Sequence, residues 1–182
     1  AVTFTGTTSA VLHRLDLGPA LEGAHGLSCG SNVRLDVYGR LTLGRGVRLM
    51  DGSYLCVGPG ATLTLGDGVF VGRYSVVVAA GSITIGSHTL IAEHVSIRDS
   101  DHSLNRDHRR HDISTVEPVV LGDDVWIAAG ARVLRGTRLG DGVVVGANAV
   151  VRGDVAAGLV VAGIPARVVK EAIDSSRRGN AS

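Results

Sequence analysis

The segment 121–155, LGDDVWIAAGARVLRGTRLGDGVVVGANAVVRGDV, repeats itself every six residues. The first, or lead, position of each unit is aliphatic, and the residue four places later is small or β-branched. The lead residues are Leu121, Ile127, Val133, Leu139, Val145 and Val151. Six residues suffice for a short strand and a turn but not for a helical hairpin. Three units can close a triangular coil, and stacked coils would pair their strands at a spacing of about 4.8 Å. The segment therefore predicts a β-solenoid with the lead residues inside.

The same register extends toward the N-terminus. Three tetrapeptides of one pattern mark it, and they begin 22 and 20 positions apart. They are Leu41–Gly44 (LTLG), Leu63–Gly66 (LTLG) and Ile83–Gly86 (ITIG). Three units of six residues make 18, so each of these coils holds an insertion of two to four residues. An ordinary β-sandwich would instead place its strands at irregular spacings of about 8–12 residues.

The composition supports this all-β interpretation and excludes several classes of protein. The chain has 182 residues, which suits one domain or one compact repeat array. Gly accounts for 26 residues and aromatic residues for only 3%, as short strands and tight turns require. The net charge of +1 argues against a nucleic-acid partner or a charged membrane surface. No apolar run reaches the roughly 18 residues of a membrane span, and no signal peptide is recognised at the start.

The cysteine content indicates a reducing location. Cys29 and Cys56 are too few for a disulfide framework, and they do not lie in the spacing of metal ligands. We therefore expect a cytoplasmic protein.

The strength of the repeat divides the chain into three parts. Residues 1–40 keep the register poorly and are expected to form an irregular N-terminal cap or a first partial coil. Residues 41–172 hold the repeat with a loop at 98–118, and residues 173–182 are expected to be a flexible polar tail. Within the repeat domain, the closing stretch Ala166–Ile173 predicts a strand or a short helix.

The repeat is interrupted once on a large scale, between Ile97 and Val119. Eleven of the fifteen residues in Arg98–Asp112 can ionise: four are basic, four are acidic and three are histidines. A loop of this length inside a tight repeat is usually functional. A solvated charged excursion is the alternative, but the density of His beside Asp favours a functional loop.

Four segments together resemble the hexapeptide-repeat acyltransferases. They are Ile85–Ile97 (IGSHTLIAEHVSI), Asp99–His102 (DSDH), Val120–Ala128 (VLGDDVWIA) and Ala162–Lys170 (AGIPARVVK). The resemblance covers most of the repeat domain and is greatest to the galactoside and maltose O-acetyltransferases and to polysaccharide O-acetyltransferases. It implies a left-handed parallel β-helix, a homotrimer with active sites between subunits, and transfer of an acetyl group from acetyl-CoA.

His102 is the candidate catalytic residue. Transfer from a thioester to a hydroxyl requires removal of the hydroxyl proton. Imidazole, with an ordinary pKa near ~6.5, can take this proton and return it to the leaving thiolate. The resemblance assigns His102 this role of general base, without an acyl-enzyme. The second ring nitrogen of such a His needs an acceptor, for which Asp99, Asp101 or a backbone carbonyl are candidates. His108 and His111 are expected to line the loop or face solvent.

The predicted donor site includes Trp126. Val125 and Ile127 point inward by register, so the indole between them points outward. The resemblance places this Trp along the acetyl-CoA cleft, and packing between subunits is the alternative. It also implies donor-binding roles, several through backbone groups, for Ala129, Ala147, Arg152, Gly153, Arg167 and Lys170. Arg167 and Lys170 would meet the nucleotide phosphates, whose negative charge needs cations; solvated surface charge is the alternative for both.

The acceptor stays open at this stage. The sugar acetyltransferases carry an acceptor-binding Asn one coil before the His, and the matching coil here, Val71–Ala80, has none. The Gly-rich segment Ala1–Arg40 also differs from their helical N-terminal region. We expect a hydroxyl of a sugar or glycosylated metabolite as the acceptor, with an amine of an amino sugar or antibiotic as the first alternative.

Two further alternatives involve no acyl transfer. One is a γ-type carbonic anhydrase, which has the same solenoid and binds zinc with three His across subunits. His88 and His94 are six residues apart, so they would lie on different faces and could not easily share a metal within one chain. No metal is therefore expected. The other alternative is a trimeric scaffold, which predicts neither CoA binding nor an effect of His102→Ala.

Overall fold

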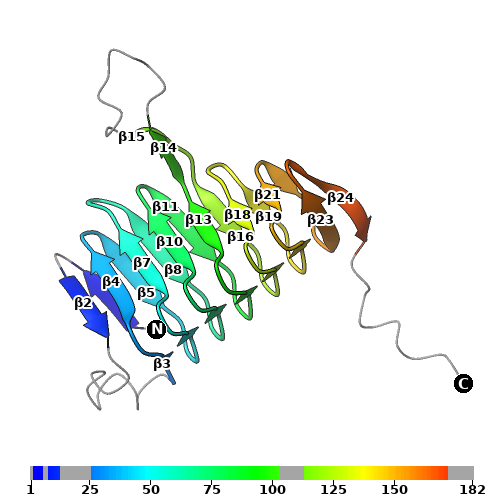
Figure 1. Ribbon diagram of the computed structural model, residues 1–182. Coiled ribbons are helices and arrows are strands. Elements are labelled where there is room, and N and C mark those ends of the chain that lie inside the picture. The colour runs from blue at the N-terminus through cyan, green and yellow to red at the C-terminus, as the bar shows by residue number, and fades with distance from the viewer. Residues whose placement is uncertain (1, 6–7, 13–25, 103–112, 172–182) are drawn as a thin grey trace, which may run out of the picture.

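The computed structural model describes residues 2–5, 8–12, 26–102 and 113–171, which form strands and turns without a helix. The strands stack into three sheets that enclose a triangular prism of about six coils (Figure 1). We call these sheets faces A, B and C and count the coils from Ser28. No part of the described chain forms a helix that could cross a membrane.

The three faces contain the following strands. Face A contains β1 (Val2–Thr5), β5 (Arg40–Leu43), β8 (Thr62–Leu65), β11 (Ser82–Ile85), β16 (Val119–Leu121), β19 (Arg138–Leu139) and β22 (Asp154–Val155). Face B contains β2 (Thr8–Leu12), β4 (Val33–Val37), β7 (Tyr54–Val57), β10 (Val76–Ala79), β13 (Ser96–Arg98), β18 (Arg132–Val133) and β21 (Val150–Val151). Face C contains β3 (Ser28–Cys29), β6 (Arg48–Leu49), β9 (Phe70–Val71), β12 (Leu90–Ile91), β17 (Trp126–Ile127), β20 (Val144–Val145), β23 (Leu159–Gly163) and β24 (Ala166–Glu171).

The chain passes from face C to face B to face A in each coil, which produces three rows of turns. The C/B corner is formed by residues 30–32, 50–53, 72–75, 92–95, 128–131 and 146–149. The B/A corner is formed by residues 38–39, 58–61, 80–81, 134–137 and 152–153, and in the fourth coil by residues 99–102 and 113–118. The A/C corner is formed by residues 44–47, 66–69, 86–89, 122–125, 140–143 and 156–158.

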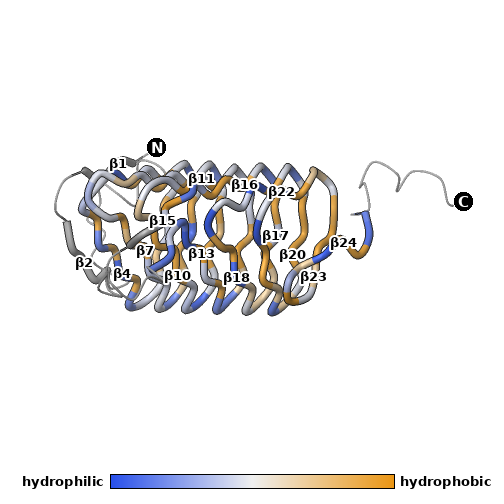
Figure 2. Tube along the Cα trace, turned by 90° about the horizontal axis from the view of Figure 1, so that it is seen from above, coloured by the Kyte–Doolittle hydropathy of each residue, from blue (hydrophilic) through white to orange (hydrophobic). Residues whose placement is uncertain are grey.

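The lead residues fill the interior of the prism, as the period predicted. On face B they form one column, in which each residue is the register partner of the next. Its members, all at most 2% exposed, are Leu55, Val77, Ile97, Val133 and Val151. Burial of each such side chain stabilises the fold by roughly 1.5–3 kcal/mol. Figure 2 shows the resulting alternation of apolar and polar positions along the coils.

The corners show a second feature with the same period. The third residue after a lead residue has a left-handed φ, and Gly130, Gly136 and Gly142 supply it in three successive turns. The same conformation is taken by Asn32, Tyr74, His88, His94, Asp124 and Asn148. Asn, Asp and His tolerate this region better than other non-glycine residues, whereas a bulky aromatic residue rarely adopts it. Tyr74 is therefore the exception in this row.

Both ends of the prism carry antiparallel strands. At the N-terminal end, β1 pairs with β5 and β2 pairs with β4. β3 and β4 already pair parallel with the strands of the next coil. Both lie within the segment 1–40, for which a cap or a first partial coil was expected. At the C-terminal end, β24 pairs with β23, so this stretch forms a closing strand and not a short helix. The predicted tail, residues 173–182, lies outside the described residues.

The interruption of the repeat emerges from the B/A corner as a hairpin (Figure 1). Its strands β14 (Ser100–His102) and β15 (Ile113–Val116) pair antiparallel. The expected loop at 98–118 is therefore β-structured where it leaves and rejoins the prism.

Candidate functional site

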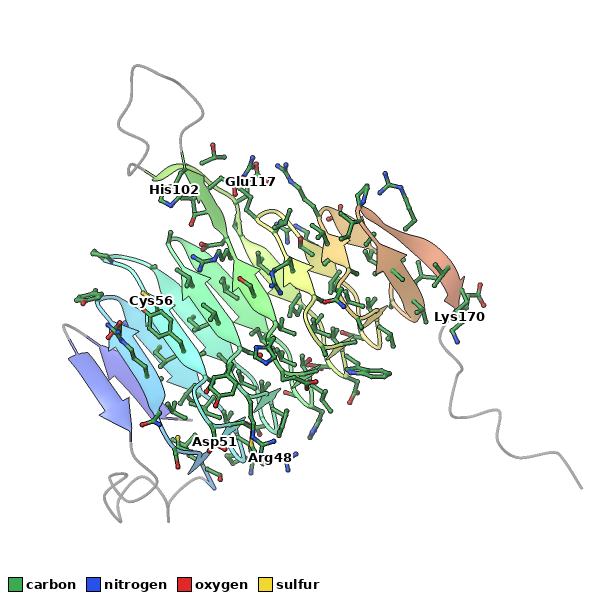
Figure 3. All side chains as sticks on the ribbon, viewed as in Figure 1. Arg48, Asp51, Cys56, His102, Glu117 and Lys170 are labelled. Carbon is green, nitrogen blue, oxygen red and sulfur yellow. The ribbon has the colours of Figure 1, made fainter. Side chains whose placement is uncertain are left out.

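His102 is the last residue of β14, on the outgoing strand of the hairpin. Its side chain is exposed, and Figure 3 shows it beyond the edge of the prism. The register of the hairpin shifts next to it. His108 and His111, the other predicted loop histidines, lie outside the described residues. The hairpin thus places the candidate base where a second molecule can reach it.

Asp99 lies at the base of the hairpin, where its carboxylate contacts the preceding coil. The residue is completely buried. Its two carboxylate oxygens accept hydrogen bonds from the backbone N–H groups of Ala80 (2.7 Å) and Gly81 (2.8 Å) in that coil. Its carbonyl accepts a further bond from the N–H of Glu117 at 2.9 Å. The carboxylate of Asp99 thus satisfies two amides of a half-buried turn.

Asp101 also has a partner other than His102. Its carboxylate forms an ion pair with the guanidinium of Arg135, which pairs with Glu117 as well. The Nη2 atom of Arg152 lies 3.4 Å from the same Glu117 carboxylate. The hydrogen bond with Asp101, together with the charge of Glu117, raises the pKa of Arg135 above its ordinary value. This hairpin clamp, formed by Asp101, Glu117, Arg135 and Arg152, ties β14 to the coil wall.

Arg135 and Glu117 were missed by the sequence reasoning. Arg135 occupies the second position after a lead residue, in the turn that follows the hairpin at the same corner. Glu117 is the residue at which the chain returns from the hairpin to face A. An arginine in the turn one coil after a charged insertion is the sequence signal that could have identified it; in the structure its side chain is only 15% exposed.

Trp126 lies on face C and is 49% exposed, as its register predicted. Leu90 and Val144 are its register partners in the two adjacent coils. Phe70 and Val160 extend the row by one coil at each end. These five outward residues form an apolar row that we call the face C stripe. Leu90 and Trp126 are exposed and the other three are half-buried, and a contiguous apolar row of this kind indicates a contact surface.

The other predicted donor residues lie at two different corners. Ala129 and Ala147 occupy equivalent positions of the C/B corner in adjacent coils, where the N–H of Asn148 donates to the Ala129 carbonyl at 2.9 Å. Arg152 and Gly153 form the B/A corner two coils after the hairpin. Each corner of a triangle lies opposite one face, so the B/A corner lies opposite face C.

The structure therefore does not gather all the predicted residues within one chain. His102 and Arg152 lie at the B/A corner, while Trp126 lies on the opposite face. Arg167 and Lys170 are exposed on β24, and Figure 3 shows Lys170 at the other end of the prism from His102. A site that uses the complete set requires a second copy of the chain.

The histidines of the coils do not form a metal site in the described part of the chain. His88 lies at the A/C corner and His94 at the C/B corner. Both have left-handed φ values, 58° and 57°, in which His is well tolerated. Among residues 26–102 and 113–171, no three His, Cys, Asp or Glu side chains are grouped as metal ligands.

A hollow of about 330 Å³ opens at the C/B corner of the third and fourth coils. The sequence reasoning did not identify it. It is lined by Met50, Phe70, Gly72, Arg73, Tyr74, Glu93 and His94. The Tyr74 and His94 rings stack with their centroids 5.5 Å apart and an interplanar angle of 16°. A stacked pair cannot be predicted from sequence without the coil lengths, because its members are 20 residues apart.

Known proteins share this architecture. The family model described as "Bacterial transferase hexapeptide (six repeats)" matches residues 118–153. A hexapeptide-repeat acetyltransferase from Vibrio cholerae O1 biovar eltor, solved with acetyl-CoA, is 31% identical over 68% of this chain and 73% of that chain, with a TM-score of 0.57. The N-acyltransferase AntD from Bacillus cereus, solved with dTDP-4-amino-4,6-dideoxyglucose and CoA, is 18% identical over 81% of this chain and 84% of that chain, with a TM-score of 0.64.

Curated relatives match over shorter segments. The putative lipopolysaccharide biosynthesis O-acetyl transferase WbbJ of Escherichia coli K12 is 48% identical over 62 residues, which is 33% of this chain and 32% of that protein. The matched segments span a third or less of the length of the first curated relatives. A 2,3,4,5-tetrahydropyridine-2,6-dicarboxylate N-acetyltransferase of Staphylococcus aureus is 52% identical over 58 residues, which is 32% of this chain and 24% of that protein. The curated relatives thus include both O- and N-acetyltransferases.

Proposed function

This chain belongs to the hexapeptide-repeat acyltransferases, which fold as left-handed parallel β-helices, and we propose that it transfers an acetyl group from acetyl-CoA to a hydroxyl of a sugar or glycosylated metabolite. The observation that supports this most directly is the exposed His102 on a hairpin that the Asp101–Arg135 ion pair ties to the coil wall. In this proposal, the hairpin presents His102 as an accessible base. The O-acetyl transferase WbbJ, among the relatives, supports a hydroxyl acceptor.

In the proposed reaction, His102 acts as general base. Its imidazole removes the proton of the acceptor hydroxyl as the hydroxyl oxygen attacks the thioester carbonyl. A carbon–oxygen bond forms, the carbon–sulfur bond breaks, and the imidazolium returns the proton to the departing thiolate of CoA. No acyl-enzyme is formed. Base catalysis of this kind accounts for about 10²–10⁴-fold of rate acceleration.

The donor would lie between two chains. We propose a homotrimer in which the B/A corner of one chain, with His102, faces the face C stripe of the next, with Trp126. The support is geometric, because these residues lie on opposite sides of a single prism and because Leu90 and Trp126, adjacent in the stripe, are 43% and 49% exposed. Such an interface would cover both side chains.

The remaining donor residues would bind CoA through the backbone of corners that carry small residues and through positively charged side chains. Ala129 and Ala147 leave the backbone of the C/B corner open to the pantetheine arm. Arg152 and Gly153 would contribute at the B/A corner. Arg167 and Lys170, exposed on the last strand, would pair with the nucleotide phosphates. We place the activity in the cytoplasm, a reducing compartment compatible with Cys29 and Cys56 remaining outside any disulfide.

Transfer to an amine is the second candidate function. It is favoured by the likeness to the N-acyltransferase AntD, which was solved with an amino sugar nucleotide. The same base and donor site would serve both reactions, so the choice depends on the acceptor. Product analysis distinguishes them, because an ester is cleaved by mild base and an amide is not.

The test is release of free thiol from acetyl-CoA in the presence of sugars, amino sugars and glycosides. We expect release with a hydroxyl acceptor and a loss of about 10²–10⁴-fold in His102→Ala, with CoA binding retained as a thermal shift. His88→Asn, at a corner away from the hairpin, is the control and should keep the full rate. Absence of both thiol release and a CoA-induced thermal shift in the unmodified chain would exclude the acyltransferase and leave a scaffold.

A further inference from the structure

The hollow at the C/B corner has an aromatic wall. Tyr74 and His94 stack in adjacent coils, and Phe70 on β9 lines the same hollow. Tyr74 is 58% exposed, so most of its ring surface is not used in packing against its own chain. A second hollow of about 240 Å³ lies beside the first, because Met50 and Arg73 line both. The corner therefore offers an extended concave surface.

Tyr74 occupies a backbone conformation that an aromatic residue rarely adopts. Its φ is 56°, at the turn position that other coils fill with Gly, Asn, Asp or His. Its ring also requires Gly52 in the preceding coil, since a Cβ at that position would lie 2.5 Å from the ring. Backbone strain of this kind persists where a side chain is needed at one place, and it is concentrated at binding sites. The fold could satisfy the same turn with Asn, as Asn32 and Asn148 show.

The polar groups at the rim complement this aromatic wall. Arg73 precedes Tyr74 in one turn and supplies a guanidinium. Glu93 precedes His94 in the other turn and supplies a carboxylate. The Nε atom of Arg73 lies 3.3 Å from the Asp51 carboxylate, which fixes its direction. An aromatic surface bordered by one hydrogen-bond donor and one acceptor suits a ligand with an apolar face and a polar perimeter.

We propose that this hollow binds the pyranose ring of a carbohydrate, and that it is the acceptor subsite of the transferase. The proposal rests on the proposed function. The C–H face of a pyranose would pack on Tyr74 and His94. Its hydroxyls would donate to Glu93 and accept from Arg73.

The position of the hollow relates it to His102. His94 lies in the turn between β12 and β13, and β13 leads directly into Asp99 and the hairpin. Hollow and hairpin thus lie at the same level of the prism but at different corners. Figure 3 shows this separation, with Asp51 of the C/B corner on one side and His102 and Glu117 on the other. A sugar bound in the hollow of one chain would meet His102 of a neighbouring chain.

The experiment compares Tyr74→Asn and His94→Asn with the matched control His88→Asn in the full chain. His88 and His94 have the same backbone conformation, and only His94 lines the hollow. Binding is measured by saturation-transfer NMR with methyl glucoside, methyl galactoside, methyl mannoside and N-acetylglucosamine. CoA-induced thermal shift and acceptor-independent thiol release are measured on every variant.

We expect at least one of these glycosides to receive saturation from the unmodified chain and from His88→Asn. The signal should fall at least about fivefold in Tyr74→Asn and His94→Asn, while the CoA shift stays unchanged. No glycoside signal in the unmodified chain, or an equal signal in all variants, overturns the sugar subsite even if CoA still binds. Loss of CoA binding in the unmodified chain with glycoside binding intact would instead contradict the proposed function.

Discussion

Arg135 and Asp101 form an ion pair that joins the coil after the hairpin to the strand that carries His102. The guanidinium also contacts Glu117, on the returning side of the hairpin, so one side chain holds both arms. Its alkyl stem is largely covered, with the side chain only 15% exposed. This contact fixes the direction of β14 where the hairpin leaves the prism. In the proposed mechanism, Arg135 would position His102 through this contact.

Arg135→Met should lower kcat by about tenfold to a hundredfold, because a displacement of the base by about 1 Å has effects of this size. The KM for acetyl-CoA should change little. Hydrogen exchange of the β14 and β15 amides should accelerate. Arg138→Met, an exposed arginine on face A, is the control. An unchanged kcat with faster exchange would show that hairpin mobility does not limit the reaction.

Asp99→Ala distinguishes a role of Asp99 in the stability of the fold from a role in orienting His102. The substitution removes the acceptors of two half-buried amides, at Ala80 and Gly81, and each amide left unsatisfied costs about 1–3 kcal/mol. The free energy of unfolding should therefore fall by at least about 2 kcal/mol, measured by denaturant titration. Activity per folded molecule should fall less than in Arg135→Met. A large loss of kcat without loss of stability would restore Asp99 as the partner of His102.

The period of the sequence predicted those features that each coil repeats. Trp126 was placed outward because Val125 and Ile127 are inward, and alternation within a strand depends only on sequence neighbours. The hairpin was located because it is the place where this alternation stops. The closing stretch Ala166–Ile173 was assigned to a strand or a short helix, and over its described residues, Ala166–Glu171, pairing with β23 decides for the strand.

Contacts between coils could not be predicted in the same way. Arg135 and Asp101 are 34 residues apart, and their meeting depends on the length of the hairpin and on the turn where it is inserted. The sequence offered Asp99, Asp101 or a backbone carbonyl as partners of His102, because the two carboxylates are close to it in sequence. In the structure, the two carboxylates contact half-buried amides and a largely covered guanidinium of adjacent coils.

Mixed oligomers should reveal whether the site is shared between chains. His102→Ala removes the proposed base, and Trp126→Ala removes the indole on the opposite face. Each pure variant should therefore have strongly reduced transferase activity. Refolded or co-expressed mixtures should regain activity, because some interfaces combine an intact His102 with an intact Trp126. For a random trimer with equal amounts of both chains, about a quarter of the interfaces would be intact. Activity no higher than that of the pure variants would place both residues in sites within one chain.

Gly86→Ala tests the close approach of neighbouring coils. A Cβ at Gly86 would overlap the backbone of Gly122 in the next coil, whereas a Cβ at Gly142 would meet nothing nearby. Gly142→Ala introduces only the left-handed strain of its φ of 67°, about 1–2 kcal/mol. Gly86→Ala must separate two backbones and should cost more, about 3 kcal/mol or beyond. Thermal denaturation of both variants compares the two effects, and an equal loss would indicate that the coils can move apart freely.

Asp67 should make a pH-dependent contribution to stability. Its carboxylate accepts a hydrogen bond from the Arg45 backbone N–H at 2.8 Å and two from the guanidinium at 3.0 and 2.9 Å. The backbone hydrogen bond, then the side-chain one, lowers the pKa of Asp67 below its usual value. A lowered folded-state pKa means that the contribution is present above about pH 4 and is lost as the pH falls through the folded-state value.

Asp67→Asn should therefore lower the Tm by a few degrees near neutral pH and by progressively less below about pH 4. The two curves should converge in strong acid, where the native carboxyl is protonated. High salt should reduce only part of the difference, because screening weakens the ion pair more than the backbone hydrogen bond. A Tm difference that stays constant from neutral pH into strong acid would show that the shape of the side chain, and not its charge, stabilises the A/C corner.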